Sequence, residues 1–206
     1  MKTLKLTAVI IFCFAVYCFA EEKSLLIDNF EGSIHGGAEA TVDSGAVGGS
    51  SVEVSSDTHI KYSGSQSLKI TYMAVPDGRI WVARGFDLDA LKSGWLVKPE
   101  DINWQAYNAI SFYMYGSNLG ADIAFDVKDS NNELFRFIVN DDFNGWKRII
   151  CRFRDFDSRQ DFQPNDASKN EKIDFPIKSY EFEPIPESKG TLYFDRVELL
   201  NIEPYR

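Results

Sequence analysis

The chain has 206 residues, with 22 basic and 31 acidic side chains and a formal net charge of −9 at pH 7. An acidic chain has no excess of cationic side chains with which to neutralise phosphates, so the composition argues against nucleic-acid binding. The two histidines, His35 and His59, lie in polar, loop-like stretches. They therefore indicate neither a histidine metal centre nor a Ser-His-Asp triad.

Residues 1–20 have the features of a cleaved secretory signal peptide. Two lysines precede an apolar run over residues 6–19, and the small Ala20 is followed by charged residues. The run is short for a membrane span, although a retained anchor is the alternative. We expect cleavage after Ala20, a secreted or periplasmic protein with no membrane span, and a single domain over residues 21–206. Cleavage would leave Cys151 as the only cysteine, and we expect it to be a buried strand residue.

Beyond the leader, apolar and polar residues alternate with a period of two, which is typical of strands. Ile110, Phe112 and Met114, for example, share one face of a predicted strand. Polar turn residues such as those at 62–66 and 130–132 separate the runs, and no amphipathic helix is evident. The pattern predicts an all-β fold, a β-sandwich jelly roll of two antiparallel sheets. The expected strands cover residues 25–27, 67–73, 80–84, 110–114, 123–127, 133–139, 147–153, 179–183 and 191–199.

Two stretches do not follow the alternation. Residues 32–56 are rich in glycine, serine and alanine, and they predict either a loop or a weak edge strand. Residues 155–172 form a long polar excursion between two predicted strands. Loops of that length in a compact domain tend to be functional, so we expect the binding or catalytic groups here.

Six short motifs occur in order along the chain: LIDNFEG at 26–32, YSGSQSLKI at 62–70, ISFYM at 110–114, GWK at 145–147, DFQP at 161–164 and GTLYFD at 190–195. On these motifs the chain resembles carbohydrate-binding module family 11 and the related galactose-binding-like jelly rolls, from about residue 25 to residue 200. The resemblance implies a non-catalytic module that binds a β-glucan chain in a cleft across a concave sheet. It also implies a structural calcium ion.

A glucan chain presents apolar ring faces rimmed with hydroxyl groups, so its binder needs aromatic platforms beside charged hydrogen-bonding groups. The loop at 159–162 supplies both kinds of group, and the family motif has an arginine and an aromatic ring at the same two positions. We expect Arg159 to donate to hydroxyl groups and Phe162 to form a platform. The family usually has tyrosine where Phe162 stands, so one hydrogen bond is missing here. The alternative is a surface loop held by an ion pair between Asp161 and Arg159.

Three more residues are candidates for the ligand site. Trp81 aligns with an aromatic residue near the family's cleft after a one-residue gap, although it could equally be a core tryptophan. Asp126 and Arg136 are polar residues between apolar ones, on what we infer to be the cleft-facing side; the alternative is a solvated face. Lys178 and Pro184 stand where the family has an acid and a tyrosine. The ligand can therefore differ from the family's mixed-linkage glucans, or sugar binding can be lost.

Asp28, Glu31 and Asp195 lie on the first and last predicted strands, which are close together in this architecture. Calcium requires six to eight oxygen ligands, which these carboxylates and the carbonyl groups of the turn at 63–65 could supply. We expect a structural Ca²⁺ here. The alternative is that these acids cap turns and pair with lysines.

Glycoside hydrolysis needs two carboxyl groups that flank the scissile bond. The sequence shows no Glu-x-Asp-x-x-Glu cluster and no two glutamates at cleft-facing strand positions, so we expect no enzymatic activity. The predicted function is a non-catalytic, extracytoplasmic module that binds a β-glucan-type polysaccharide. One alternative is an envelope or periplasmic jelly roll with a protein partner, similar to flagellar-coat proteins or assembly factors. A small glycoside hydrolase is the remaining alternative.

Overall fold

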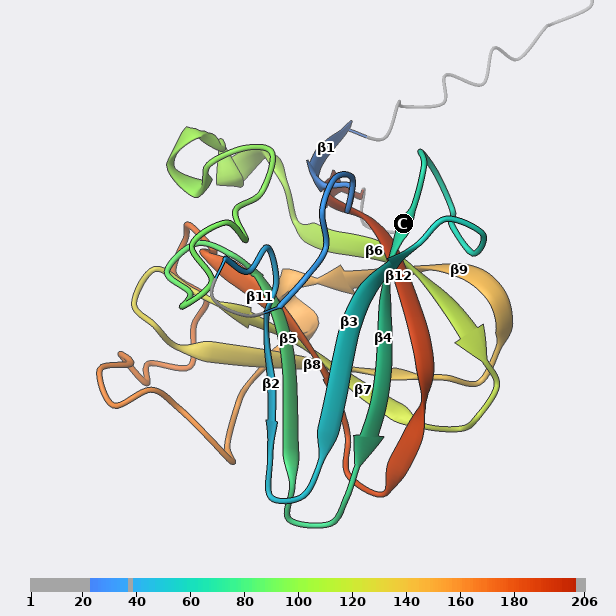
Figure 1. The fold of residues 1–206 in the computed structure, drawn as a ribbon. Coiled ribbons are helices and arrows are strands. Elements are labelled where there is room, and N and C mark those ends of the chain that lie inside the picture. The colour runs from blue at the N-terminus through green and yellow to red at the C-terminus, as the bar shows by residue number, and fades with distance from the viewer. Residues whose placement is uncertain (1–22, 37–38, 203–206) are drawn as a thin grey trace, which may run out of the picture.

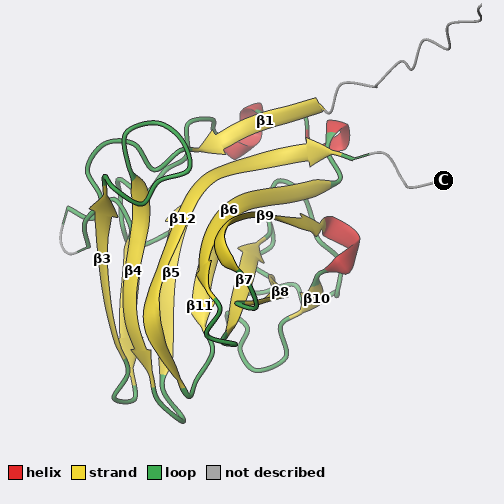
Figure 2. Ribbon diagram, turned by 90° about the vertical axis from the view of Figure 1, so that its right-hand side faces the viewer, coloured by secondary structure: helices red, strands yellow, loops and turns green. Residues whose placement is uncertain are grey.

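The computed structural model describes residues 23–36 and 39–202, which form a sandwich of two antiparallel sheets (Figures 1 and 2). The predicted all-β class and sandwich architecture are confirmed. The first sheet has the order β3-β4-β12-β6-β9, with β1 paired to β12. Its strands are β1 (Lys23–Asp28), β3 (Ser51–Asp57), β4 (Ser67–Ala74), β6 (Ala109–Ser117), β9 (Asn144–Arg152) and β12 (Ser188–Asn201).

The second sheet has the order β10-β8-β7-β11-β5-β2. Its strands are β2 (Asp43–Val47), β5 (Arg79–Gly85), β7 (Asp122–Lys128), β8 (Leu134–Asn140), β10 (Asp157–Ser158) and β11 (Ser179–Pro184). Three single-turn 3₁₀ helices are the only helices among the described residues: η1 (Pro99–Asp101), η2 (Trp104–Ala106) and η3 (Phe153–Asp155).

The core lies between the two sheets and is dominated by aromatic rings. Phe112 of β6 and Phe194 of β12 pack against Phe182 of β11, with the rings of Phe182 and Phe194 stacked. Because successive side chains on a strand point to opposite faces, the alternate residues of the second sheet must face outward. On β11, Tyr180 and Phe182 are buried in the core, so Glu181 lies on the outer face.

The irregular stretch at 32–56 contains two edge strands. β2 pairs only with β5, and β3 pairs only with β4. The edge-strand interpretation of this stretch is therefore confirmed. Cys151 lies on β9 and is fully buried, also as predicted.

No helix in residues 23–36 and 39–202 is long and apolar enough to cross a membrane. The expected signal peptide at 1–20 lies outside the described residues.

Candidate functional site

The outer face of β5, β11, β7 and β8 carries a row of charged side chains. Glu181 of β11 is paired in register with Asp126 of β7, which in turn is paired with Arg136 of β8. Directly opposed residues on neighbouring strands place their side chains on the same face. The pairing therefore sets the three charged groups side by side on the outer face of the second sheet.

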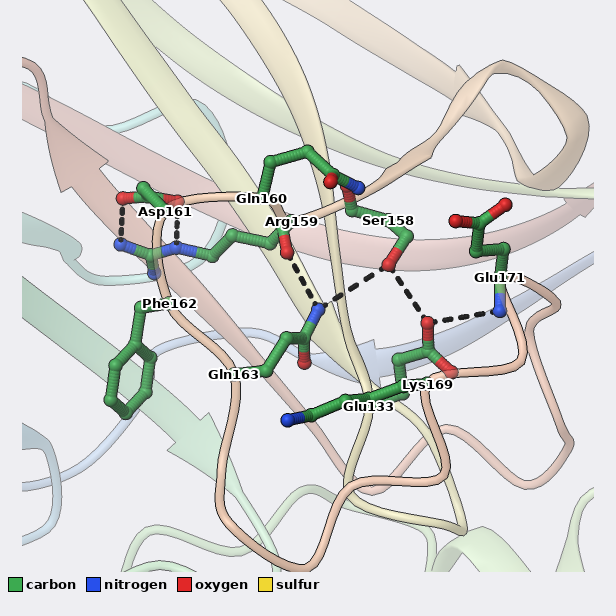
Figure 3. A pocket seen from close by; sticks show the side chains of 9 residues that line it. All are labelled: Glu133, Ser158, Arg159, Gln160, Asp161, Phe162, Gln163, Lys169 and Glu171. Atoms are coloured by element: carbon green, nitrogen blue, oxygen red, sulfur yellow. Dashed lines mark hydrogen bonds and ion pairs between the residues drawn. The ribbon is translucent and has the colours of Figure 1, made fainter.

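The polar loop after β10 folds over this face because Gln163 attaches it to β8. The Gln163 side-chain oxygen accepts from the backbone N–H of Leu134 at 2.8 Å, and its amide nitrogen donates to the Leu134 carbonyl oxygen at 2.8 Å. The same nitrogen donates to the carbonyl oxygen of Arg159 at 2.9 Å. These bonds imitate a strand pairing and bring Arg159 and Phe162 above the sheet (Figure 3).

Seven side chains from the loop and the sheet form one network of ion pairs, which we name the charged cluster. It joins β5, β11, β7 and β8 to the loop through contacts of 2.7 to 3.9 Å between nitrogen and oxygen atoms. The members are Arg79, Arg136, Arg159, Asp126, Asp161, Glu181 and Glu183.

Arg159 is the buried centre of the charged cluster, with a side chain that is 1% exposed. It binds Asp161 through two parallel hydrogen bonds of 2.8 and 2.9 Å, and it donates to Asp126 at 2.9 Å. Glu183 lies 2.9 Å from the same guanidinium. The predicted pair of Asp161 and Arg159 is present. Arg159 is not placed to donate to a ligand, because its donors are engaged beneath the surface. The expected role as a hydroxyl donor does not fit this geometry.

Within the charged cluster, ion pairing favours the ionised forms of Asp161 and Arg136. A hydrogen bond from Arg159, opposed by burial, lowers the pKa of Asp161 to about 2. Burial alone would lower the pKa of Arg136, but its hydrogen bonds to Asp126 and the charges of Asp126 and Glu183 raise it above the ordinary arginine value. Separating buried ion pairs costs free energy, so the charged cluster forms a rigid charged surface.

Two aromatic rings lie at the edge of the charged cluster. Trp81 faces outward from β5 and is half-buried, with its ring packed over Gly45 and its Nε1 donating to Asp43 at 3.1 Å. Phe162 in the loop is 45% exposed. The guanidinium carbon of Arg79 lies 4.7 Å from the centre of the Phe162 ring and 5.9 Å from that of Trp81. Trp81 is therefore not a core residue, and both predicted rings lie at the same face.

The sequence interpretation missed three members of this site. Arg79 alternates with core residues on β5, just as Glu181 and Glu183 do on β11. The statement that no two glutamates occupy face-lining strand positions is wrong, because Glu181 and Glu183 do so. The alignment with the family placed Lys178 at the position of the family's acid. Lys178 lies before β11 and pairs with Asp87 at 2.9 Å. The period-two alternation at 179–183 was the signal that could have identified both glutamates.

The three expected calcium ligands have hydrogen-bond partners within the protein. Asp28 is buried and receives hydrogen bonds from Arg84, at 2.5 and 3.1 Å, and from Tyr180 at 2.8 Å. A guanidinium group in direct contact would repel a cation. Glu31 and Asp195 accept backbone N–H groups of the turn at 62–65. These two acids match the turn-capping alternative, and Asp28, which is paired with Arg84, does not fit a calcium ion.

Among the described residues, one group of three carboxylates has ligand atoms within 4.8 Å of one another: Asp126, Glu181 and Glu183. All three belong to the charged cluster. Guanidinium groups occupy the oxygens of Asp126 and Glu183, so a metal ion would have to displace these pairs.

The face is hollowed on both sides of the loop. A hollow of about 150 Å³ lies between Arg79, Phe162 and Glu181. On the other side, a hollow of about 310 Å³ is lined by Glu133, Gln163 and Lys169 (Figure 3). Glu133 is fully buried there and accepts from the hydroxyl groups of two serines and from two backbone N–H groups, so it holds the loop in place.

Comparison with known proteins agrees with the sandwich fold. The family model described as carbohydrate binding domain (family 11) matches residues 18–202. The chain belongs to carbohydrate-binding module family 11. The predicted resemblance is thus confirmed over nearly the whole chain. No match was found among curated proteins.

Solved structures of family 11 modules share the fold at low identity. The module of a cellulosomal cellulase of Clostridium thermocellum is 18% identical, with a TM-score of 0.67 over 90% of this chain and 99% of that one. A family 11 module from the same organism, in complex with a β-1,3-1,4-mixed-linked tetrasaccharide, is 20% identical, with a TM-score of 0.68 over 88% and 96%. A β-1,2-glucanase from Parabacteroides distasonis is 12% identical, with a TM-score of 0.53 over 86% of this chain and 25% of that one.

Proposed function

We propose that this family 11 module is a non-catalytic, extracytoplasmic protein that binds a β-glucan-type polysaccharide on the outer face of β5, β11, β7 and β8. The observation that carries the proposal is the placement of two partly exposed rings, Trp81 and Phe162, beside the charged cluster. Stacking rings and fixed polar groups are what the faces and rims of a sugar chain require. The tetrasaccharide bound by a similar family 11 module supports the β-glucan class.

The side chains available to a ligand are the solvent-exposed members of the charged cluster. The side chain of Arg136 is 18% exposed and that of Asp161 is 59% exposed, so they can exchange hydrogen bonds with sugar hydroxyl groups. Arg159 and Asp126 act one layer below and position them. Because the buried pairs fix these groups before a ligand arrives, little conformational entropy is lost on binding.

The same pairs argue against hydrolysis. A glycosidase needs one carboxyl group as an acid and a second, ionised one that is free to act as a nucleophile or base. Asp126 and Glu183 are almost fully buried, and their oxygens accept from Arg136 and Arg159. Neither is free to attack a sugar or a water molecule.

Native affinity electrophoresis in gels that contain barley β-glucan, xyloglucan or cellulose derivatives tests the proposal. The mature protein should be retarded by at least one polymer, and Phe162→Ala and Trp81→Ala should each reduce the retardation. Phe175→Ala is the matched control, since this ring is 43% exposed but packs on Trp104, away from the charged cluster.

Three outcomes would contradict the proposal. Absence of retardation across a broad glycan panel would leave the envelope or protein-interaction role in its place. Retardation that Phe162→Ala and Trp81→Ala leave unchanged would move the binding site elsewhere. Release of reducing ends from any of the polymers would make the protein a hydrolase.

A further inference from the structure

The charged cluster contains one more carboxyl group than guanidinium group. Its cations are Arg79, Arg136 and Arg159, and its acids are Asp126, Asp161, Glu181 and Glu183. Asp126, Arg159 and Glu183 are buried, and an unbalanced charge is costly beside buried groups. One acid must therefore take up a proton, or a cation must be added.

Glu181 is the acid with the weakest pairing. Its closest guanidinium nitrogens belong to Arg79, at 3.3 Å, and to Arg159, at 3.9 Å. Asp126, by contrast, receives two hydrogen bonds of 2.8 Å from Arg136 and one of 2.9 Å from Arg159. Glu183 lies 2.7 and 2.9 Å from the same two guanidinium groups.

Exposure to water also separates Glu181 from the fourth acid. Asp161 has two short bonds to Arg159 and a side chain that is 59% exposed, so it is both paired and hydrated. The Glu181 side chain is 15% exposed, so it is neither closely paired nor well hydrated. The proton that balances the cluster therefore belongs on Glu181.

The groups that face Glu181 from the neighbouring elements agree with this assignment. Burial is the largest cause that raises the pKa of Glu181, and the charges of Asp126 and Glu183 act in the same direction. Arg79 and Arg159 oppose them, and the net result is a pKa of about 8. Lys128 of β7 lines the same hollow, but its ammonium group donates to the backbone carbonyl of Asp87.

We propose that Glu181 keeps its proton at neutral pH and serves as an uncharged hydrogen-bond donor in the hollow, so that the face is electrically balanced and takes an uncharged glycan. The choice of ligand class rests on the proposed function, whereas the protonation of Glu181 does not. An ionised Glu181 would give the face a net negative charge, which a neutral hydroxyl group does not neutralise.

Urea unfolding of the wild type and of Glu181→Gln between pH 5.5 and 9 tests the protonation. Below a pH of about 8, the native wild type holds one proton more than its unfolded state, whose glutamate titrates near its ordinary value. The wild type therefore loses stability relative to the glutamine variant as the pH rises. The ratio of their unfolding constants should change by up to tenfold per pH unit and should level off above about pH 8.

A ratio that does not change over this range would overturn the proposal. Glu39→Gln is the control, because it removes a carboxyl group from an exposed ion pair with Lys92, outside the charged cluster. Its unfolding constant should keep a constant ratio to that of the wild type from pH 5.5 to 9. If Glu181→Gln fails to fold, the infrared band of a protonated carboxyl group in the wild type decides the question: it should be present at pH 7 and lost above pH 9, and its absence at pH 7 would refute the assignment.

Affinity electrophoresis at two pH values tests the ligand class. Retardation by neutral barley β-glucan should weaken from pH 6.5 to pH 9 in the wild type and stay constant in Glu181→Gln. Stronger retardation by a uronic acid polymer than by the neutral glucan would overturn the choice of an uncharged ligand. If no polymer retards the protein at either pH, the proposed function fails, while the unfolding experiment still decides whether Glu181 is protonated.

Discussion

Two residues of one loop motif have opposite relations to the solvent. Arg159 and Phe162 are three positions apart, and both are residue types that suit a sugar surface. The Arg159 side chain is 1% exposed and Phe162 is 45% exposed. The sequence identifies the chemistry of both side chains. The burial of Arg159, however, depends on Asp126 and Glu183, which come from other strands. Their contacts with Arg159 could not be predicted from the loop alone.

The different depths predict different effects on stability. Arg159→Ala leaves Asp126 and Glu183 buried with fewer cations, so it should lower the free energy of unfolding by about 3–5 kcal/mol. Phe162→Ala should lower it by about 1 kcal/mol or less, since the ring is half in water. Urea unfolding of both variants measures the difference. Equal losses would show that the Arg159 side chain is not buried.

Asp28 belongs to a second buried ion pair, with Arg84 on the core-facing side of β5. Asp28→Asn leaves the guanidinium of Arg84 buried without its anion, and it should lower the free energy of unfolding by about 3–5 kcal/mol. Glu39→Gln is the control, because Glu39 forms an exposed pair with Lys92. Exposed pairs contribute about 0–1 kcal/mol, so the control should unfold close to the wild type. A small loss in Asp28→Asn would contradict the pairing with Arg84.

At the scale of elements, strands were predictable and the path of the long loop was not. Alternation located β5, β7, β8 and β11 of the second sheet because buried and outward positions differ in polarity. It did not locate the short β10, which lies in the stretch expected to be a loop. The loop at 155–172 has no such period. Its position is set by Gln163, whose side chain pairs with the backbone of Leu134, and by Glu133, which accepts loop donors. Such long-range bonds have no local signal in the sequence.

Gln163 is therefore the anchor that a loop variant should test. Gln163→Ala removes the acceptor for the backbone N–H of Leu134, and it should speed hydrogen exchange at that amide and lower stability by about 1–2 kcal/mol. Gln160→Ala is the matched control, since Gln160 is exposed and donates only to the carbonyl of Ser158. Unchanged exchange at Leu134 in Gln163→Ala would show that the strand itself, not the side chain, protects this amide.

At the scale of the whole molecule, the family's architecture was predictable, whereas the partners of the expected calcium ligands were not. Order and register of six motifs located the sandwich, because each motif marks a strand or turn of the same fold. The carboxylates at the expected ion site have found other partners: Arg84 for Asp28, and backbone N–H groups for Glu31 and Asp195. A motif preserves the position of an acid, but the partner of that acid depends on residues elsewhere in the chain.

The hydrogen-bond partners of these three acids predict how the protein responds to metal removal. A ligand that binds only the native state raises its stability, so a calcium-dependent module melts at a lower temperature in chelator. Here the expected ligands are already satisfied by an arginine and by N–H groups, and a chelator should leave the melting temperature unchanged. Asp195→Asn should be destabilised equally with calcium and with chelator, because it weakens the hydrogen bonds from Tyr62 and Ser63 rather than an ion site. Thermal unfolding of both proteins in calcium and in chelator measures this, and a melting temperature that falls in chelator for the wild type but not for Asp195→Asn would place a calcium ion on that carboxylate.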